Sequence, residues 1–188
     1  MSENINNCCS VEKGALVNCV RISAMDPALI VESTAGLFGT CEKISGIISW
    51  INEKSLDDAD PSLGVLRSEL DSLSQVFVSI HTSFREASVA RCVLLPQTGY
   101  EGQHWRNVKR SLDDCKGSLF KLDRFFHPLA KAKRSQAVLQ SKAIKSMIRE
   151  LNLADVQVFK QQITSYRKVL ELSQQLIDVY YPRLILES

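Results

Sequence analysis

Apolar residues recur at alternating steps of three and four along most of the chain, which is the spacing that places them on one side of an α-helix. In the clearest stretch, from Trp105 to Phe126, the apolar residues are Trp105, Val108, Leu112, Cys115, Leu119, Leu122 and Phe126. The charged residues of this stretch fall mostly on the other side. A helix with one apolar face needs neighbours that cover it, so the pattern predicts one member of a helical bundle.

Two further helices with apolar faces are predicted before this one. The first extends from Pro27 to about Glu53 and the second from Pro61 to about Val89. Each begins with an aspartate followed by a proline, a capping residue and a residue suited to the first helical position. Their apolar faces consist of Ile30, Thr34, Leu37, Cys41, Ile44, Ile48 and Ile51 in the first helix, and of Leu63, Leu66, Leu70, Leu73, Phe77, Ile80 and Phe84 in the second.

Two more helices are predicted after His127-Pro128, a pair that ends or kinks the central helix. A shorter basic helix is expected from Leu129 to Leu151, and a last long helix from about Asp155 to Tyr181, where Pro182 stops it. Residues 90–103 break the helical pattern with one proline and two glycines, so we expect a loop there.

The fold class that follows is all-α, an antiparallel bundle of four long helices plus one shorter helix. We expect the bundle domain to occupy residues 25–181. Residues 1–24 are expected to form a poorly ordered extension, and residues 182–188 a short tail.

The composition agrees with one ordinary domain and indicates no unusual partner. The chain has 188 residues, of which 45% are hydrophobic and 23% charged, and its net charge of +2 favours no nucleic-acid partner. The six cysteines show no C-x-x-C pair and no histidine at ligand spacing, so we expect no zinc site and expect Cys41 and Cys115 to act as small buried hydrophobes. The beginning of the chain has no secretory signal, which favours a cytoplasmic setting.

The sequence lacks the motifs on which enzymes of common classes depend. It contains no phosphate-binding loop, no G-x-S-x-G and no H-E-x-x-H, and the three histidines stand alone on different segments. Its adjacent aspartates point in different directions on a helix. We therefore expect no enzyme, no catalytic residue, no cofactor, no metal and no small-molecule substrate.

A cluster of bases is the strongest local charge signal. From Lys131 to Arg149 the chain carries six bases and no acid, and several share one helix face. This face is either solvated or attracted to anionic phospholipid headgroups, where each base contributes on the order of 1 kcal/mol. Nucleic acid is disfavoured because the stretch has no aromatic residues for base stacking. The candidate residues for anionic lipid or a partner are Lys131, Lys133, Arg134, Lys142, Lys145 and Arg149.

The first helix carries small residues beside its apolar face. Such residues let a neighbouring helix come close, both in a water-soluble bundle and in a membrane. Glu32, Glu42 and Lys43 argue against a resident membrane helix, which leaves an ordinary core helix and conditional membrane insertion as the two interpretations. The candidate membrane or oligomerisation residues are Ile30, Gly36, Leu37, Phe38, Gly39, Gly46 and Ile47.

With the helices placed, a family resemblance emerges. The sequence MDPALI from Met25 to Ile30 resembles the M-D-P-L-S-I opening of the HeLo-like N-terminal domains of filamentous fungi, found ahead of STAND (NLR-like) modules or ankyrin repeats and in a protein of azaphilone pigment clusters. LRSELDSLSQVF is similar to the family pattern L-x-x-E-L-x-x-L, and residues 112–122 resemble its pattern L-x-D-C-x-x-x-L-x-x-L. The resemblance covers Met25 to Val179.

The resemblance implies a relation to helical cell-death executioners, which oligomerise and permeabilise membranes with the first helix as the membrane-active element. The expected function is then a non-enzymatic signalling domain of the fungal cell-death or innate-immunity type, which engages the anionic plasma membrane through the first helix and the basic helix. The alternative is a soluble protein-protein interaction or self-association module without membrane activity. The expected partners are accordingly another protein or further copies of the chain, and an anionic phospholipid membrane.

Overall fold

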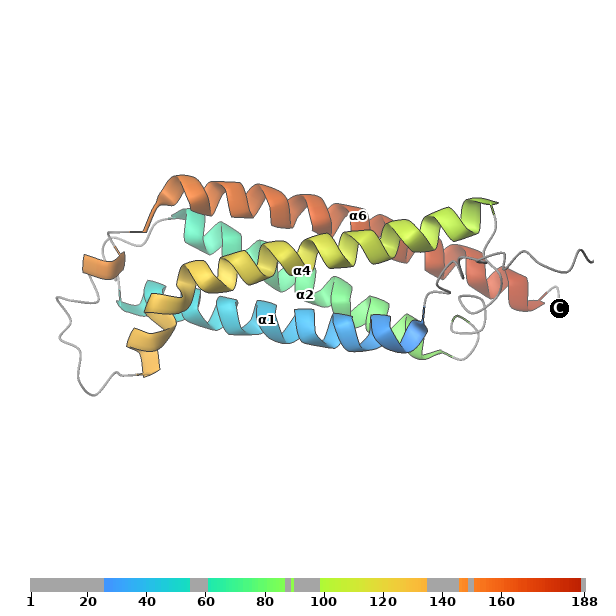
Figure 1. Cartoon of the computed structure of the whole chain (residues 1–188), viewed down its shortest axis with the longest axis horizontal. Helices are drawn as coiled ribbons and strands as arrows, with labels where there is room; N and C mark the ends of the chain where they lie inside the picture. Colours follow the sequence, from blue (N-terminus) through green and yellow to red (C-terminus); the bar gives the residue numbers. More distant parts are fainter. Residues whose placement is uncertain are drawn as a thin grey trace, which may run out of the picture.

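A computed structural model shows four long helices, α1 (Pro27–Lys54), α2 (Pro61–Arg85), α4 (Gly99–Arg134) and α6 (Leu153–Leu186). Residues 146–148 form a short helical stretch, and the described part of the chain contains no strand. The structure describes residues 26–54, 61–86, 89, 99–134, 146–148 and 151–186. The predicted all-α bundle of four long helices plus a shorter one is confirmed (Figure 1).

Each long helix runs opposite to the one before it along the chain (Figure 1). α1 packs against α2 and α4, and α6 packs against the same two helices from the other side. The succession is therefore antiparallel, whereas the lateral pairs α1–α4 and α2–α6 each run in the same direction. The polar contacts agree for α2–α6, because Ser62 contacts Gln157 near one end and Ser83 contacts Gln174 near the other.

The apolar faces predicted for α1, α2 and α4 form the core. All their residues named above are buried, with at most 4% of the surface of any side chain exposed. The hydroxyl of Thr34 donates a hydrogen bond to the carbonyl of Ile30 at 2.9 Å, so this polar group is satisfied inside the core. α6 contributes Val156, Ile163, Leu170 and Ile177. One continuous core therefore lies between the four helices.

The thiols of Cys41 and Cys115 lie in this core and are free. Burial raises the pKa of Cys115 to about 12, and burial together with the neighbouring Cys115 raises that of Cys41 far above its ordinary value. Both side chains are thus neutral at physiological pH. The prediction that they act as small buried hydrophobes is confirmed.

Two helix starts are capped by the side chain that precedes them. The carboxylate of Asp26 accepts a hydrogen bond from the backbone N–H of Ala28 at 2.9 Å, with Pro27 as the first residue of α1. Asn152 accepts one from the N–H of Ala154 at 3.1 Å. α6 consequently begins at Leu153, two residues before the predicted start.

Two predicted breaks in the helices, at Gly99 and at Pro182, are wrong, and Pro128 kinks α4 without ending it. α4 begins at Gly99 rather than at the end of the expected loop, it continues through Pro128 to Arg134, and α6 continues through Pro182 to Leu186. Glycine costs a helix about 1 kcal/mol and proline about 3 kcal/mol, local penalties that the rest of a long helix can outweigh. Beyond Pro128 the gain is visible, because Leu129 and Ala132 are each only 2% exposed.

The C-terminal part of α4 bends across the end of α1 (Figure 1, yellow to orange). A proline inside a helix removes one backbone hydrogen bond and displaces the carbonyl four residues earlier, which kinks the helix. Pro128 therefore accounts for the bend. The sequence predicted either an end or a kink of the helix at this position, and the structure shows the kink.

We predict that Leu70→Ala lowers the free energy of unfolding by about 2–5 kcal/mol, because Leu70 is fully buried and the substitution leaves a cavity. The matched control is Leu29→Ala on α1, where the leucine is 60% exposed and the change should stay below about 0.5 kcal/mol. Urea denaturation followed by circular dichroism measures both. Equal losses in the two variants would contradict this arrangement of the core.

Candidate interaction surface

An open depression lies where the N-terminal end of α1 meets the C-terminal end of α2. His81 at its edge donates a ring N–H to the carbonyl of Val31 at 3.1 Å, which ties the two helices together. Among the described residues there is no group of three or more His, Cys, Asp or Glu side chains that could hold a metal ion. The depression is lined by Asp26, Pro27, Ala28, Val31, Glu32, Ala35, His81, Phe84 and Arg85. Its wall is mostly apolar, and its charged side chains come from the ends of the two helices.

The predicted basic face is divided where the structure describes it. Lys131 and Arg134 are exposed at the end of α4. Lys133 is half-buried, and its Nζ donates a hydrogen bond to the carbonyl of Gly46 in α1 at 2.8 Å. One predicted lipid-binding base therefore holds two helices together. Lys142, Lys145 and Arg149 lie outside the described residues.

The apolar candidates for membrane insertion in α1 are part of the core. Ile30, Leu37 and Ile47 are only 3%, 4% and 3% exposed, and Phe38 is half-buried against the core. No described helix has an apolar stretch of sufficient length to span a membrane. Membrane insertion of α1 would thus require its inner face to leave the bundle.

Among the glycines of α1, only Gly46 lies close to a side chain of another helix in the described part of the chain. Gly36 and Gly39 are exposed, and a Cβ atom placed on either would meet nothing within 4 Å. A Cβ on Gly46 would lie 3.8 Å from Nζ of Lys133. The stripe of small residues that the sequence displays is therefore an open outer surface along most of its length.

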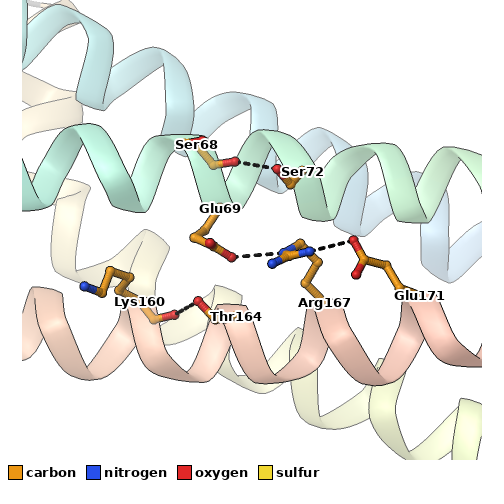
Figure 2. A network of polar contacts seen from close by, with 7 residues as sticks. All are labelled: Ser68, Glu69, Ser72, Lys160, Thr164, Arg167 and Glu171. Carbon is orange, nitrogen blue, oxygen red and sulfur yellow. Dashed lines mark hydrogen bonds and ion pairs between the residues drawn. The ribbon is translucent and has the colours of Figure 1, made fainter.

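A set of polar contacts joins α2 to α6 (Figure 2). Arg167 on α6 donates through Nε to Glu69 of α2 at 3.0 Å and through Nη1 to Glu171 of its own helix at 2.7 Å. These hydrogen bonds, that to Glu171 first, raise the pKa of Arg167 above its ordinary value. The side chains of Arg167 and Glu69 are only 21% and 22% exposed, so water screens the contact less than it screens a surface ion pair.

Two amide side chains of α6 make further contacts with α2. Gln157 donates to the hydroxyl of Ser62, and Gln174 to the hydroxyl of Ser83, each at 2.7 Å. Together with Arg167 they lie along one side of α6 and fix how far it is shifted along α2. This side of α6 therefore packs against the rest of the bundle.

The opposite side of α6 bears a second apolar surface, which we call the outer stripe. Its members are about half exposed or more, from 46% at Leu176 to 60% at Val179. The other exposed residues on this side include Lys168 and four that are polar but uncharged, namely Gln161, Gln162, Ser165 and Gln175. The outer stripe consists of Val158, Val169, Leu172, Leu176 and Val179.

The sequence interpretation missed the outer stripe because it assigned this helix a single apolar face, which consists of Val156, Phe159, Ile163, Tyr166, Leu170 and Ile177. The signal is present: Val169, Leu172, Leu176 and Val179 follow one another at steps of three, four and three. Ile163, Leu170 and Ile177 follow at steps of seven on the other side. Both series are amphipathic patterns, and the structure shows that the second, which the sequence interpretation assigned to the apolar face, is the buried one.

These features define an all-α four-helix bundle whose candidate site is an exposed helix face. Comparison with models of protein families, with curated proteins and with solved structures finds no match for this chain. The geometry of the bundle and its surface therefore carries the functional argument.

We predict that Arg167→Met lowers the free energy of unfolding by about 1–2 kcal/mol, because Glu69 and Glu171 then face each other without their cation while the alkyl packing is kept. The control is Lys109→Met, which breaks the ion pair with Asp113 on the exposed side of α4 and should cost less than about 0.5 kcal/mol. Chemical denaturation of both variants gives the comparison. Similar small effects in the two variants would mean that the Arg167 contacts contribute no more to the free energy of unfolding than an ordinary surface ion pair does.

Proposed function

We propose that this chain is a non-enzymatic helical interaction domain that works through helix faces. The observation that carries the proposal is the outer stripe of α6, where five half-exposed aliphatic side chains line up opposite the buried side of the same helix. A continuous line of exposed apolar side chains is energetically unfavourable for an isolated protein in water. Amphipathic helices commonly bind partners through such an apolar face. The stripe is therefore the binding surface.

The resemblance of residues 25–179 to HeLo-like domains supports a signalling role for this interaction. In that setting the bundle is a cytoplasmic module that assembles with another protein or with further copies of itself. This part of the proposal depends on the sequence patterns near Met25, in α2 and in residues 112–122.

Engagement of anionic membranes is a second candidate function, favoured by the exposed positions of Lys131 and Arg134 at the end of α4. These bases can approach a lipid surface while the bundle stays closed. Insertion of α1 demands more: the bond from Lys133 to Gly46 and the ion pair between Lys43 and Asp123, at 2.6 Å, would have to open. Surface binding is consequently the form of membrane contact that this structure favours.

The interaction proposal predicts that Leu172→Lys abolishes binding through α6, because a charge then replaces a central aliphatic side chain of the stripe. Leu29→Lys is the matched control, since Leu29 on α1 is 60% exposed and Leu172 is 59% exposed. Sedimentation velocity of the purified chain and capture from extracts of the source cells measure association. Equal association of the wild type and both variants would show that the stripe is not the binding surface.

The membrane proposal predicts that the double variant Lys131→Glu/Arg134→Glu loses binding to vesicles that contain phosphatidylserine, by about tenfold or more, since two attractive charges become repulsive. Arg106→Glu/Arg110→Glu is the control, because both bases are exposed on the same helix nearer its beginning. Co-sedimentation with anionic and neutral vesicles provides the measurement. Loss of binding in both double variants to the same degree would indicate general charge attraction without a site.

A further inference from the structure

We infer that the occupant of the outer stripe is the same stripe of a second copy of this chain, packed antiparallel about a two-fold axis at the level of Gln174. This inference rests on the proposed function, because it names the partner of the same surface. It follows from the order of the residues, from the distribution of charge and from the position of α6 in the bundle.

The order of the residues in the C-terminal part of the stripe, from Val169 to Val179, is the same in both directions. Val169, Leu172, Leu176 and Val179 are arranged symmetrically about position 174, as valine, leucine, leucine, valine. When two such helices lie antiparallel about this level, Leu172 of one copy meets Leu176 of the other, and Val169 meets Val179. An interface between identical copies must be self-complementary in this way. All four layers then pair side chains of the same kind and size.

The charges are compatible with the antiparallel arrangement. Lys168 is the exposed charged residue at the edge of this part of the stripe, while Gln175 on the same edge is uncharged. A dimer contains two copies of Lys168. In the antiparallel pair they are displaced by twelve residues, or about 18 Å along the axis. This separation exceeds the Debye length of about 10 Å at 0.1 M salt, so their repulsion is screened.

The position of α6 leaves the stripe accessible to a second bundle. α6 is at the edge of the molecule in Figure 1, and its packing against α2 and α4 uses the other side of the helix. Four half-exposed aliphatic side chains supply only part of the about 800 Å² that each partner buries in a standard interface. We therefore expect a reversible dimer with a dissociation constant on the order of micromolar.

The first measurement is sedimentation equilibrium of the full chain over a range of concentrations. We expect a monomer–dimer equilibrium in the wild type. Leu172→Lys should weaken the dimer at least about 100-fold, because the substitution occurs twice in it and each should cost about tenfold. Leu29→Lys should leave it unchanged. Circular dichroism of all three proteins establishes that the bundle is folded in each.

The second measurement reports the direction of packing by cross-linking with a short bismaleimide. Gln175→Cys should link to the same position of the other copy, because the two positions are only about 3 Å apart along the axis. Gln161→Cys should not link to itself, because its two copies are about 39 Å apart along the axis. Peptide mass spectrometry identifies the linked positions and separates them from products of the native cysteines. Self-linking at both positions would show parallel packing and overturn the inference.

A wild-type chain that stays monomeric up to about 0.5 mM, or a dimer insensitive to Leu172→Lys, would also overturn the inference. The results that would contradict the proposed function differ from those that would contradict the dimer. If the chain is monomeric yet binds another protein, and this binding is lost in Leu172→Lys but kept in Leu29→Lys, the stripe is a binding surface with a different occupant. If neither form of association depends on the stripe, the proposed function falls as well.

Discussion

The burial of one apolar face from each of four long helices is the constraint on which the structure depends. No single helix of this chain can cover its own row of aliphatic and aromatic side chains, so each is stable only in the presence of the others. At one end of the shared core, Phe84 of α2 and Trp105 of α4 pack edge to face, with their ring centres 5.4 Å apart. The same exclusion of water keeps the thiols of Cys41 and Cys115 neutral.

Apolar burial holds the helices together, while polar contacts decide how two of them fit. The hydrophobic effect has no preferred direction, so it tolerates small shifts of one helix along another. Hydrogen bonds demand particular distances and angles. Arg167, Gln157 and Gln174 supply such contacts from α6 to α2, and they all lie on one side of α6. That side is fixed against the bundle, and the outer stripe must in consequence face away from it.

This division of α6 into two faces connects the fold to the proposed function. A helix that needs only to complete a bundle can be mostly polar on its outer side, as α4 is with Lys109 and Asp113, where Phe120 is the exposed exception. α6 instead presents aliphatic side chains to water in a symmetric order. By contrast, the first helix, which the family resemblance singles out, has most of its large apolar side chains in the core, and its Gly36 and Gly39 are outside. The closed bundle thus exposes the surface of the proposed interaction directly, whereas the inner face of α1 would become accessible only after the bundle opens.

The sequence by itself determined the number and type of the long helices, the starts of α1 and α2, and the inner faces of α1, α2 and α4 residue by residue, because helical periodicity and capping are local properties. It also placed the end of α1 within one residue, but it did not determine where α4 begins or where α4 and α6 end. Glycine and proline lower local helix stability at Gly99, Pro128 and Pro182, but the length and packing of the whole helix decide whether it continues. The sequence identified the buried face of α6 as well, but it did not show that Lys133 donates a hydrogen bond to Gly46, or that α6 carries a second, exposed apolar face. Those outcomes depend on contacts between residues far apart in the chain, and only the tertiary structure brings them together.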